Sequence, residues 1–260
     1  MASAADKHSS LDDTERNYTL LQGYEWCECM RRFGPTICAN PTCPAFLLLD
    51  TPAGGTHWQW LGDNAARFAD LGITAVWIPP PTKAANTDST GFDVYDLWDL
   101  GEFARQGQEG EEKRTKYGTR EQLEEAMSKL RKEGISVIVD AVLNHRMGAD
   151  DKETFRVQQV DDNDRTKNIG EERDIEGWTK FEFKGRNGKH SDFKMDFNHF
   201  TGVDYDAKTG DKGVFRILGK NKSFADDVDG EKGGYDYLMG ADVDHAHPDV
   251  AGDIINWGKW

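Results

Sequence analysis

The first half of the chain alternates short apolar runs with longer segments in which apolar residues recur at helical spacing. The apolar and β-branched runs at 19–26, 73–78 and 135–139 are typical of strands, and the last two read as buried parallel strands. Between them, 58–69 and 123–130 have the pattern of amphipathic helices. The order strand, helix, strand, helix, strand predicts parallel units with right-handed connections, and so an α/β protein.

Cap residues indicate where these helices begin and end. Thr119 precedes one helix and Gln122 follows three positions later, which is the spacing of a capping box. Gly72 and Gly134 each follow the last apolar position of a helix, where glycine ends a helix without steric cost. A further amphipathic helix is expected from Pro248, a residue suited to the first helical position.

Residues 146–240 lack this rhythm. They are rich in Asp, Lys, Gly and Asn and contain short alternating pieces with aromatic residues, such as 178–183. A structureless connection of this length is unusual within a domain. The stretch is therefore predicted to be an inserted, mostly β sub-domain.

Composition narrows the classes of partner. The net charge of −15 argues against a nucleic-acid or anionic-membrane surface, because both need clustered Lys and Arg, and it suits a neutral substrate or a bound cation. No apolar run is long enough to span a membrane. The first 17 residues contain no apolar core of a secretory signal, so a cytoplasmic protein is expected.

All four cysteines lie between residues 27 and 43, which raises the alternative of a zinc site. Their spacing matches no common zinc knuckle, and the segment interrupts a connection that is usually short. Joining Trp26 to Thr51 through one residue gives a continuous strand and loop, and the codons permit splice signals at both ends of the segment. We therefore interpret 27–50 as a suspected retained-intron insert.

Candidate chemistry gathers at the end of the strand at 135–139. Asp140, Asn144 and His145 supply an acid, an amide and an imidazole there. In a β/α barrel the C-terminal ends of the strands face the active site, so this is where functional side chains are expected. Read alone, His145 is more often a hydrogen-bonded structural histidine than a substrate contact.

The strand with D-x-x-x-N-H after it resembles the first conserved region of the α-amylase family of glycoside hydrolases. Further matching segments follow in order, and together they are specific: LLQGYEW (20–26), GITAVWIPP (72–80), YDLWDLGEF (95–103), RTKYGTREQL (114–123), SDFK (191–194) and YDYLMGADVDHAHPDV (235–250). The chain resembles the N-terminal part of the liquefying, intracellular-type α-amylases of fungi and bacteria.

The resemblance implies an α/β fold, a partial (β/α)8 TIM barrel holding the first three strand-helix units, with an irregular β sub-domain inserted between strand 3 and helix 3. The expected domains are 1–17, a disordered N-terminus; 18–145, the first part of the barrel; 146–240, the inserted sub-domain; and 241–260, the return to the barrel and its third helix. The implied function is hydrolysis of α-1,4-glucans such as starch or glycogen with retention, by a protein that is a monomer when complete and binds neither nucleic acid nor membrane.

The resemblance also assigns site residues. Asn144, Asp236 and Asp242 are implied as Ca2+ ligands, and hard oxygen donors of this kind suit that ion. From spacing alone, Asp236 and Asp242 are better read as solvated loop acids, and the resemblance makes calcium the favoured reading. His145 is implied to donate to the sugar beside the scissile bond, and Asp140 to organise charge near the site.

Three aromatic residues complete the implied substrate contacts: Phe92, Tyr95 and Trp26. For Tyr95 and Trp26 a place in the core is the alternative. Phe92 stands where the family usually has a sugar-stacking Tyr, so the stacking face remains and the hydroxyl is lost.

Other positions depart from the family pattern. Asp244 suits a second metal cluster found in bacterial relatives, but Thr201 and Ala246 replace two of its acidic ligands, so we do not expect that cluster. A retaining glycosidase needs a carboxylate nucleophile and a carboxylic acid about 5–5.5 Å apart. The family places both beyond residue 260, so no catalytic residue is expected in this chain, which should be inactive alone; a non-catalytic glucan-binding or calcium-binding fragment is the alternative.

Overall fold

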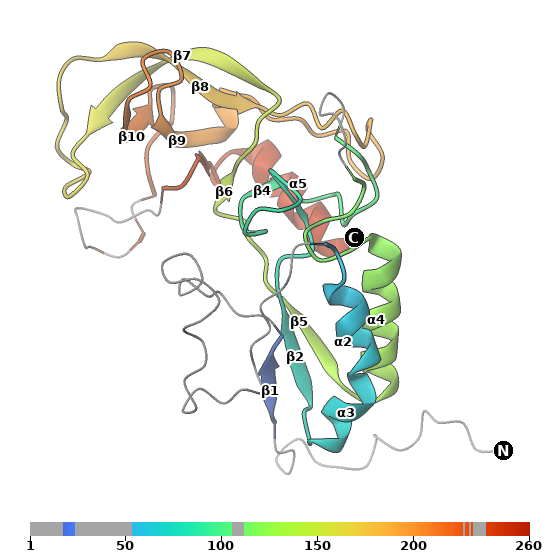
Figure 1. Cartoon of the computed structure of the whole chain (residues 1–260). Coiled ribbons are helices and arrows are strands. Elements are labelled where there is room, and N and C mark those ends of the chain that lie inside the picture. The colour runs from blue at the N-terminus through green and yellow to red at the C-terminus, as the bar shows by residue number, and fades with distance from the viewer. Residues whose placement is uncertain (1–17, 24–53, 106–111, 226, 229, 231–237) are drawn as a thin grey trace, which may run out of the picture.

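The computed structural model describes residues 18–23, 54–105, 112–225, 227–228, 230 and 238–260. The predicted disordered N-terminus, the suspected insert with its cysteines, and the candidate site residues Trp26 and Asp236 lie outside the described residues. Two sheets occupy opposite ends of the molecule, with helix α5 (Pro248–Lys259) beside the connection between them (Figure 1). No helix among the described residues is both long and apolar enough to cross a membrane.

A three-stranded parallel sheet is formed by β1 (Leu20–Gln22), β2 (Ala75–Ile78) and β5 (Ser136–Val139), in that order. Leu20 lies opposite Ala75, and Ala75 opposite Ser136, so the three strands start in step. The strands and the crossover helices between them agree with the parallel α/β units that the hydrophobic pattern predicts.

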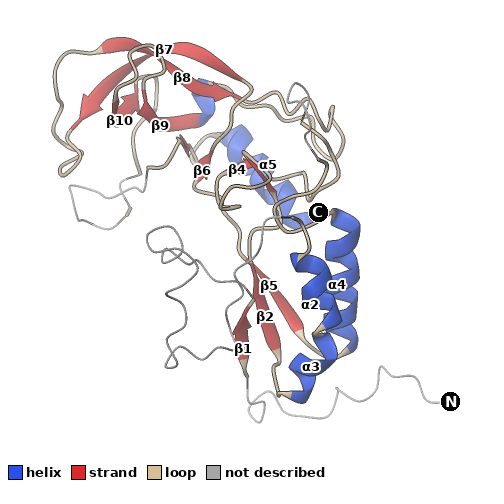
Figure 2. Ribbon diagram, viewed as in Figure 1, coloured by secondary structure: helices blue, strands red, loops and turns tan. Residues whose placement is uncertain are grey.

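Three helices lie together on one side of this sheet: α2 (His57–Asp63), α3 (Ala65–Asp70) and α4 (Arg120–Lys132) (Figure 2). The predicted single helix over 58–69 is broken at Asn64, whose side-chain amide donates to the Trp60 carbonyl at 2.9 Å. Helices α2 and α4 approach closely at Gly62, where an added Cβ would lie 3.1 Å from the Ala126 Cα. The apolar faces bury one core, which contains Trp58, Leu61, Phe68, Val76, Leu123 and Leu130.

The capping box predicted for α4 is present. The Thr119 hydroxyl accepts from the Gln122 amide at 3.3 Å, and the Gln122 side chain accepts from the Thr119 amide at 2.9 Å. The helix predicted from Pro248 is also confirmed as α5, with Pro248 in its first turn.

The prediction that the strand at 135–139 is buried is wrong for most of its length. Ile135 is buried, but Ile138 is 47% exposed and Val139 39% exposed. The described helices cover only one face of the sheet, and no described strand pairs with the outer edge of β5. The described parallel strands thus form an open sheet, and an eightfold barrel stays a prediction.

A six-stranded antiparallel sheet occupies the region 146–240 for which a β insertion is predicted, and it extends beyond that region to residues 145 and 241–243. Its order is β6 (His145–Arg146), β11 (Ala241–Val243), β9 (Phe200–Tyr205), β10 (Lys212–Ile217), β7 (Asp151–Val160) and β8 (Arg173–Lys180). Strand β9 follows the 3-10 turn η1 (Phe197–His199). One face of this sheet packs a second core around Phe155, Ile175, Phe181, Phe200, Phe215 and Ile217.

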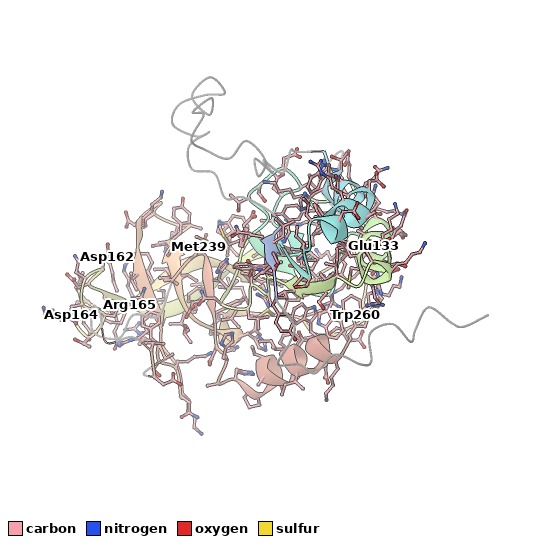
Figure 3. The ribbon with its side chains drawn as sticks, turned by 90° about the horizontal axis from the view of Figure 1, so that it is seen from below. Glu133, Asp162, Asp164, Arg165, Met239 and Trp260 are labelled. Carbon is pink, nitrogen blue, oxygen red and sulfur yellow. The ribbon has the colours of Figure 1, made fainter. Side chains whose placement is uncertain are left out.

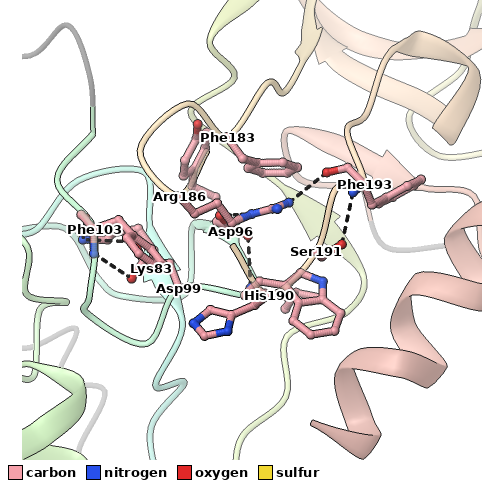
Figure 4. Close-up of polar contacts among 12 residues, drawn as sticks. Lys83, Asp96, Asp99, Phe103, Phe183, Arg186, His190, Ser191 and Phe193 are labelled. Atoms are coloured by element: carbon pink, nitrogen blue, oxygen red, sulfur yellow. Dashed lines mark hydrogen bonds and ion pairs between the residues drawn. The ribbon is translucent and has the colours of Figure 1, made fainter. Parts of the chain in front are cut away.

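Buried ion pairs join the insertion to the segment that precedes it. The two-stranded ribbon of β3 (Lys83–Ala84) and β4 (Val94–Asp96) lies between β2 and β5 in sequence. Arg186 binds Asp96 at 2.9 Å and also donates to the Phe193 carbonyl, and both charged side chains are at most 4% exposed (Figure 4). Helix α5 joins this segment as well, because the Trp98 indole donates to Asp253 at 3.1 Å.

Candidate functional site

Strands β6 and β11 form a seam at which the chain leaves the region of the parallel sheet and later returns to it. In their antiparallel register His145 lies opposite Asp242. The Val243 amide donates to the Asn144 carbonyl at 2.9 Å, which extends the pairing by one residue. The seam therefore brings together Asn144, His145 and Asp242, three site residues predicted from the sequence and 98 positions apart at most (242 minus 144).

His145 is neutral in this environment and its hydrogen bonds define its tautomer. Burial lowers the pKa of His145, and the side chain is 6% exposed. The imidazole Nε2 lies 3.0 Å from the Phe92 carbonyl, which can only accept, so Nε2 carries the proton. Nδ1 is then an acceptor for the Asn144 side-chain amide, 3.4 Å away. His145 therefore positions the loop that carries Phe92 (the Phe92 loop), and its Nε2–H already donates a hydrogen bond to the Phe92 carbonyl.

The tautomer of His145 sets the orientation of the Asn144 side-chain amide. Because its NH2 group points to His145, its oxygen Oδ1 is directed elsewhere and is of the type that a hard cation binds. Asp242 is 2% exposed, and its carboxylate accepts from the Thr201 hydroxyl on β9. A carboxylate buried to this degree requires compensation by hydrogen bonds or positive charge. An amide oxygen and a buried carboxylate on the paired segments of the seam are ligand types that suit calcium, which binds through oxygen.

Tyr95 is placed in the interior rather than on a surface. It is 3% exposed, and its hydroxyl donates to the Asp150 carboxylate at 2.8 Å. The Arg105 guanidinium lies over its ring, 4.1 Å from the centroid. Burial and the Asp150 charge raise the pKa of Tyr95, so the phenol stays protonated. This setting favours the core alternative over direct contact with a substrate.

A cavity of about 420 Å³ opens beside the seam, with residues of β8 and β9 in its wall. Its wall includes the aromatic side chains of Trp178 and Tyr205, which are 46% and 36% exposed. Polar groups enter it from Asp204, which accepts from the Gly240 amide at 2.8 Å, and from Arg105. The remaining wall is made mainly of small or apolar side chains: Ala85, Met147, Ala149, Val203 and Ala241. Figure 3 shows Met239, the residue before Gly240, between Asp162 at the antiparallel-sheet end of the molecule and Glu133 at the parallel-sheet end.

Two glycines keep the inner end of this cavity open. Gly148 and Gly240 have φ of +75° and +62°, which side chains adopt only with strain. An added Cβ would lie 2.9 Å from the Ala85 Cα at Gly148, and 2.8 Å from the Arg146 carbonyl at Gly240. The close approach of β6 and β11 therefore depends on glycine at 240, and the approach of the chain after β6 to Ala85 depends on glycine at 148.

A histidine pair lies next to the seam. Ligand atoms of His199, His247 and Asp249 lie within 4.8 Å of one another. The His199 Nδ1 accepts from the Asp196 amide at 3.0 Å, and the His247 Nδ1 accepts from the Asp249 amide at 3.3 Å. Both rings thus hold backbone amides in caps, which places the proton of each neutral ring on Nε2 and leaves no lone pair there for a metal.

The sequence did not identify the residues that line the cavity. The alternation along β8 distinguishes buried Ile175 from exposed Trp178 but cannot show that Trp178 faces a hollow. That hollow forms where residues of β6, β9 and β11 meet, and β6 and β11 are distant from β8 in the sequence. A large exposed aromatic residue in an alternating strand was the one available signal.

Comparison with known proteins identifies relatives of this sequence. Residues 63–174 match the family model of the α-amylase catalytic domain. The chain is 44% identical over 210 residues to glucan 1,4-α-maltohexaosidase of Bacillus sp. strain 707, which covers 80% of this chain. It is 39% identical over 253 residues to the α-amylase of Bacillus licheniformis, covering 97% of this chain, and 41% identical over 224 residues to the cytoplasmic α-amylase of Escherichia coli K12, covering 85%.

The matches cover much less of the relatives than of this chain. The chain spans 40% of the Bacillus sp. protein and 44% of each of the other two. The similarity therefore extends over most of the present sequence and under half of each relative.

Proposed function

This chain belongs to the α-amylase family, and from that premise we propose that it forms the N-terminal part of a glycosidase that hydrolyses α-1,4-glucans such as starch or glycogen with retention. The observation that carries the proposal is the cavity beside the seam, with exposed Trp178 and Tyr205 in its wall. Large aromatic side chains exposed in a hollow, with a few polar groups among them, are characteristic of ligand sites.

The cavity offers two kinds of contact to a sugar. The apolar face of a pyranose ring can pack on the Trp178 indole, and sugar hydroxyls can donate to the Asp204 carboxylate. The chain's acidic balance favours a neutral substrate over an anionic one. Under this proposal His145 acts by positioning the Phe92 loop, and a direct bond from its Nε2 to a sugar requires that loop to release it.

We propose that Asn144, Asp236 and Asp242 hold a calcium ion at the seam. The ion would bring positive charge to the buried Asp242 carboxylate and tie the insertion to the parallel sheet. Its function in this chain is structural, because the seam residues hold the cavity wall in place.

The carboxylates that form and cleave the glycosyl-enzyme bond are proposed to lie in the part of the relatives that this chain does not match. The 260-residue chain alone is then expected to release no reducing sugar from soluble starch. Chelator-sensitive hydrolysis by the purified chain, free of contaminating amylase, would contradict this assignment. A chain that binds glucan without cleaving it is the second candidate, favoured by the same cavity.

Native electrophoresis through gels containing soluble starch tests the glucan site. Trp178→Ala should reduce the starch-dependent retardation about tenfold, which corresponds to about 1.4 kcal/mol of binding free energy. Trp60→Ala is the matched control, because Trp60 is 37% exposed on α2 and does not line the cavity. Equal retardation of the Trp178 variant and the unaltered chain, with both shown to be folded by circular dichroism, would refute the proposed site.

A further inference from the structure

An almost buried ammonium group lies beside the seam. The Lys222 side chain is 8% exposed, and its Nζ donates to the Asp244 carboxylate at 2.7 Å. It also donates to the Phe200 carbonyl at 3.1 Å and to the Asn198 carbonyl. Three oxygens, from η1, β9 and the residue after β11, thus surround one nitrogen.

The chemistry of this oxygen cage is that of a cation site. An ammonium has three donors and no acceptor, so the three oxygens use it fully. Two carbonyl oxygens and a carboxylate are also the ligands that a hard metal cation binds. Asp244 is 6% exposed and lies two positions after the buried Asp242, so positive charge at this point offsets the repulsion between two buried acids.

The loop that carries Lys222 is docked on β9 by a second contact. The Phe224 ring packs against Gly202, where an added Cβ would lie 2.8 Å from the Phe224 Cε1. The position of the ammonium is therefore set by packing as well as by charge.

We propose that Lys222 is a built-in cation: its ammonium occupies a metal-type oxygen cage, so that this position binds a metal ion only when Lys222 is removed. This inference is independent of the calcium site proposed at Asn144, Asp236 and Asp242, and it explains in physical terms why Asp244 needs no metal. The chain should then bind at most one calcium ion at the seam. Substitution of Lys222 by a small residue should uncover a site for Na+ or Ca2+.

Thermal unfolding of four forms of the chain tests this: unaltered, Lys222→Ala, Lys222→Met and Lys220→Ala. In metal-free buffer with choline chloride, Lys222→Ala should melt well below the unaltered chain. Added NaCl or CaCl2 should raise its Tm by more than that of the unaltered chain, and equilibrium dialysis should show one additional calcium ion. Lys222→Met, which fills the cage with an uncharged side chain, should be destabilised without rescue. Lys220 is exposed, so its variant should behave as the unaltered chain does.

The proposal is wrong if Lys222→Ala is as stable as the unaltered chain without metal, or if it fails to recover in Na+ or Ca2+. A second variant separates this result from the proposed seam site. Asp242→Asn alone should remove the calcium response of the unaltered chain. The double variant Asp242→Asn with Lys222→Ala should keep the additional response that Lys222→Ala creates. Loss of the additional response on Asp242→Asn would show a single shared site and overturn the inference.

Discussion

Individual buried side chains give this protein its sensitivity to pH. His57 on α2 is 3% exposed, and its Nε2 has no hydrogen-bond partner among the described residues. Burial lowers the pKa of His57 to about 4, and a hydrogen bond to the Gly23 backbone acts weakly in the opposite direction. Between pH 6.5, the ordinary pKa, and about pH 4, the unfolded chain therefore binds a proton that the folded chain does not. The free energy of unfolding consequently decreases as the pH is lowered through this range.

His57→Asn should remove this pH dependence. Between pH 7 and pH 5 the unaltered chain should lose about 2 kcal/mol more unfolding free energy than the variant, since each unit of pKa shift corresponds to about 1.4 kcal/mol. Urea denaturation at the two pH values measures the difference. Parallel losses in both forms would show that folding does not lower the pKa of His57.

Asp96 is a buried residue whose pKa shifts in the opposite direction to that of His57. Burial raises the pKa of Asp96 to about 6, although the Arg186 guanidinium opposes that rise. Arg186→Met should destabilise the chain at pH 7.5 by about 3–5 kcal/mol, because it leaves a buried carboxylate without its counter-charge. The loss should shrink towards pH 5, where the folded chain protonates Asp96 more readily than the unfolded chain does.

The double variant Arg186→Met with Asp96→Asn serves as the control for that prediction. A neutral amide needs no counter-charge, so the double variant should be more stable than Arg186→Met alone at pH 7.5. Chemical denaturation curves of the three forms decide the matter. If the double variant is the least stable, the arginine contributes through packing and its Phe193 bond instead of charge.

At the scale of elements, capping residues within a helical turn predicted where the helices begin. Features that depend on contacts between distant parts of the sequence were predicted poorly. The capping box of α4 and the proline at the start of α5 depend on residues within one turn, so sequence spacing was sufficient. The burial of β5 depends on what covers its edge, and the apolar run at 135–139 carries no such information. The same limit concealed the use of the His145 Nε2–H by the Phe92 carbonyl, 53 residues away in sequence.

The cap of α4 provides a quantitative test at this scale. Thr119→Ala should lower the unfolding free energy by about 1 kcal/mol, because the Gln122 amide loses its acceptor. Ser128→Ala is the comparison: Ser128 is exposed in the middle of α4, where alanine favours the helix slightly. Guanidinium unfolding of both variants gives the difference, and an equal effect of the two would mean that the cap does not stabilise the chain.

The whole molecule presents an uncovered part of its parallel sheet. Leu20 is 54% exposed on β1 and Ile138 47% exposed on β5, and both strands are edges of the described sheet. Exposed apolar side chains beside an open strand edge favour pairing with another chain. The isolated 260-residue chain is therefore expected to self-associate at micromolar concentration and to bind a hydrophobic dye.

Ile138→Thr should weaken both effects, because threonine keeps the β-branched shape that suits a strand while it reduces apolar surface. Ile255→Thr is the matched control, since Ile255 is 57% exposed on α5 away from the sheet edges. Sedimentation velocity and dye fluorescence of the two variants provide the comparison. A monomeric chain without dye binding would show that the sheet is covered in solution.

The pairing of β6 with β11 also has a consequence for protein engineering. Arg146 and Ala241 are opposite each other in the register, so the chain enters and leaves the 147–240 stretch through adjacent residues. A stretch whose two ends are held side by side can be exchanged for another of different length at a closure cost that grows only with the logarithm of that length. Residues 147–240 thus begin and end side by side, and a graft from a relative must keep Gly148 and Gly240 as well as the contacts of Asp150 with Tyr95 and of Arg186 with Asp96.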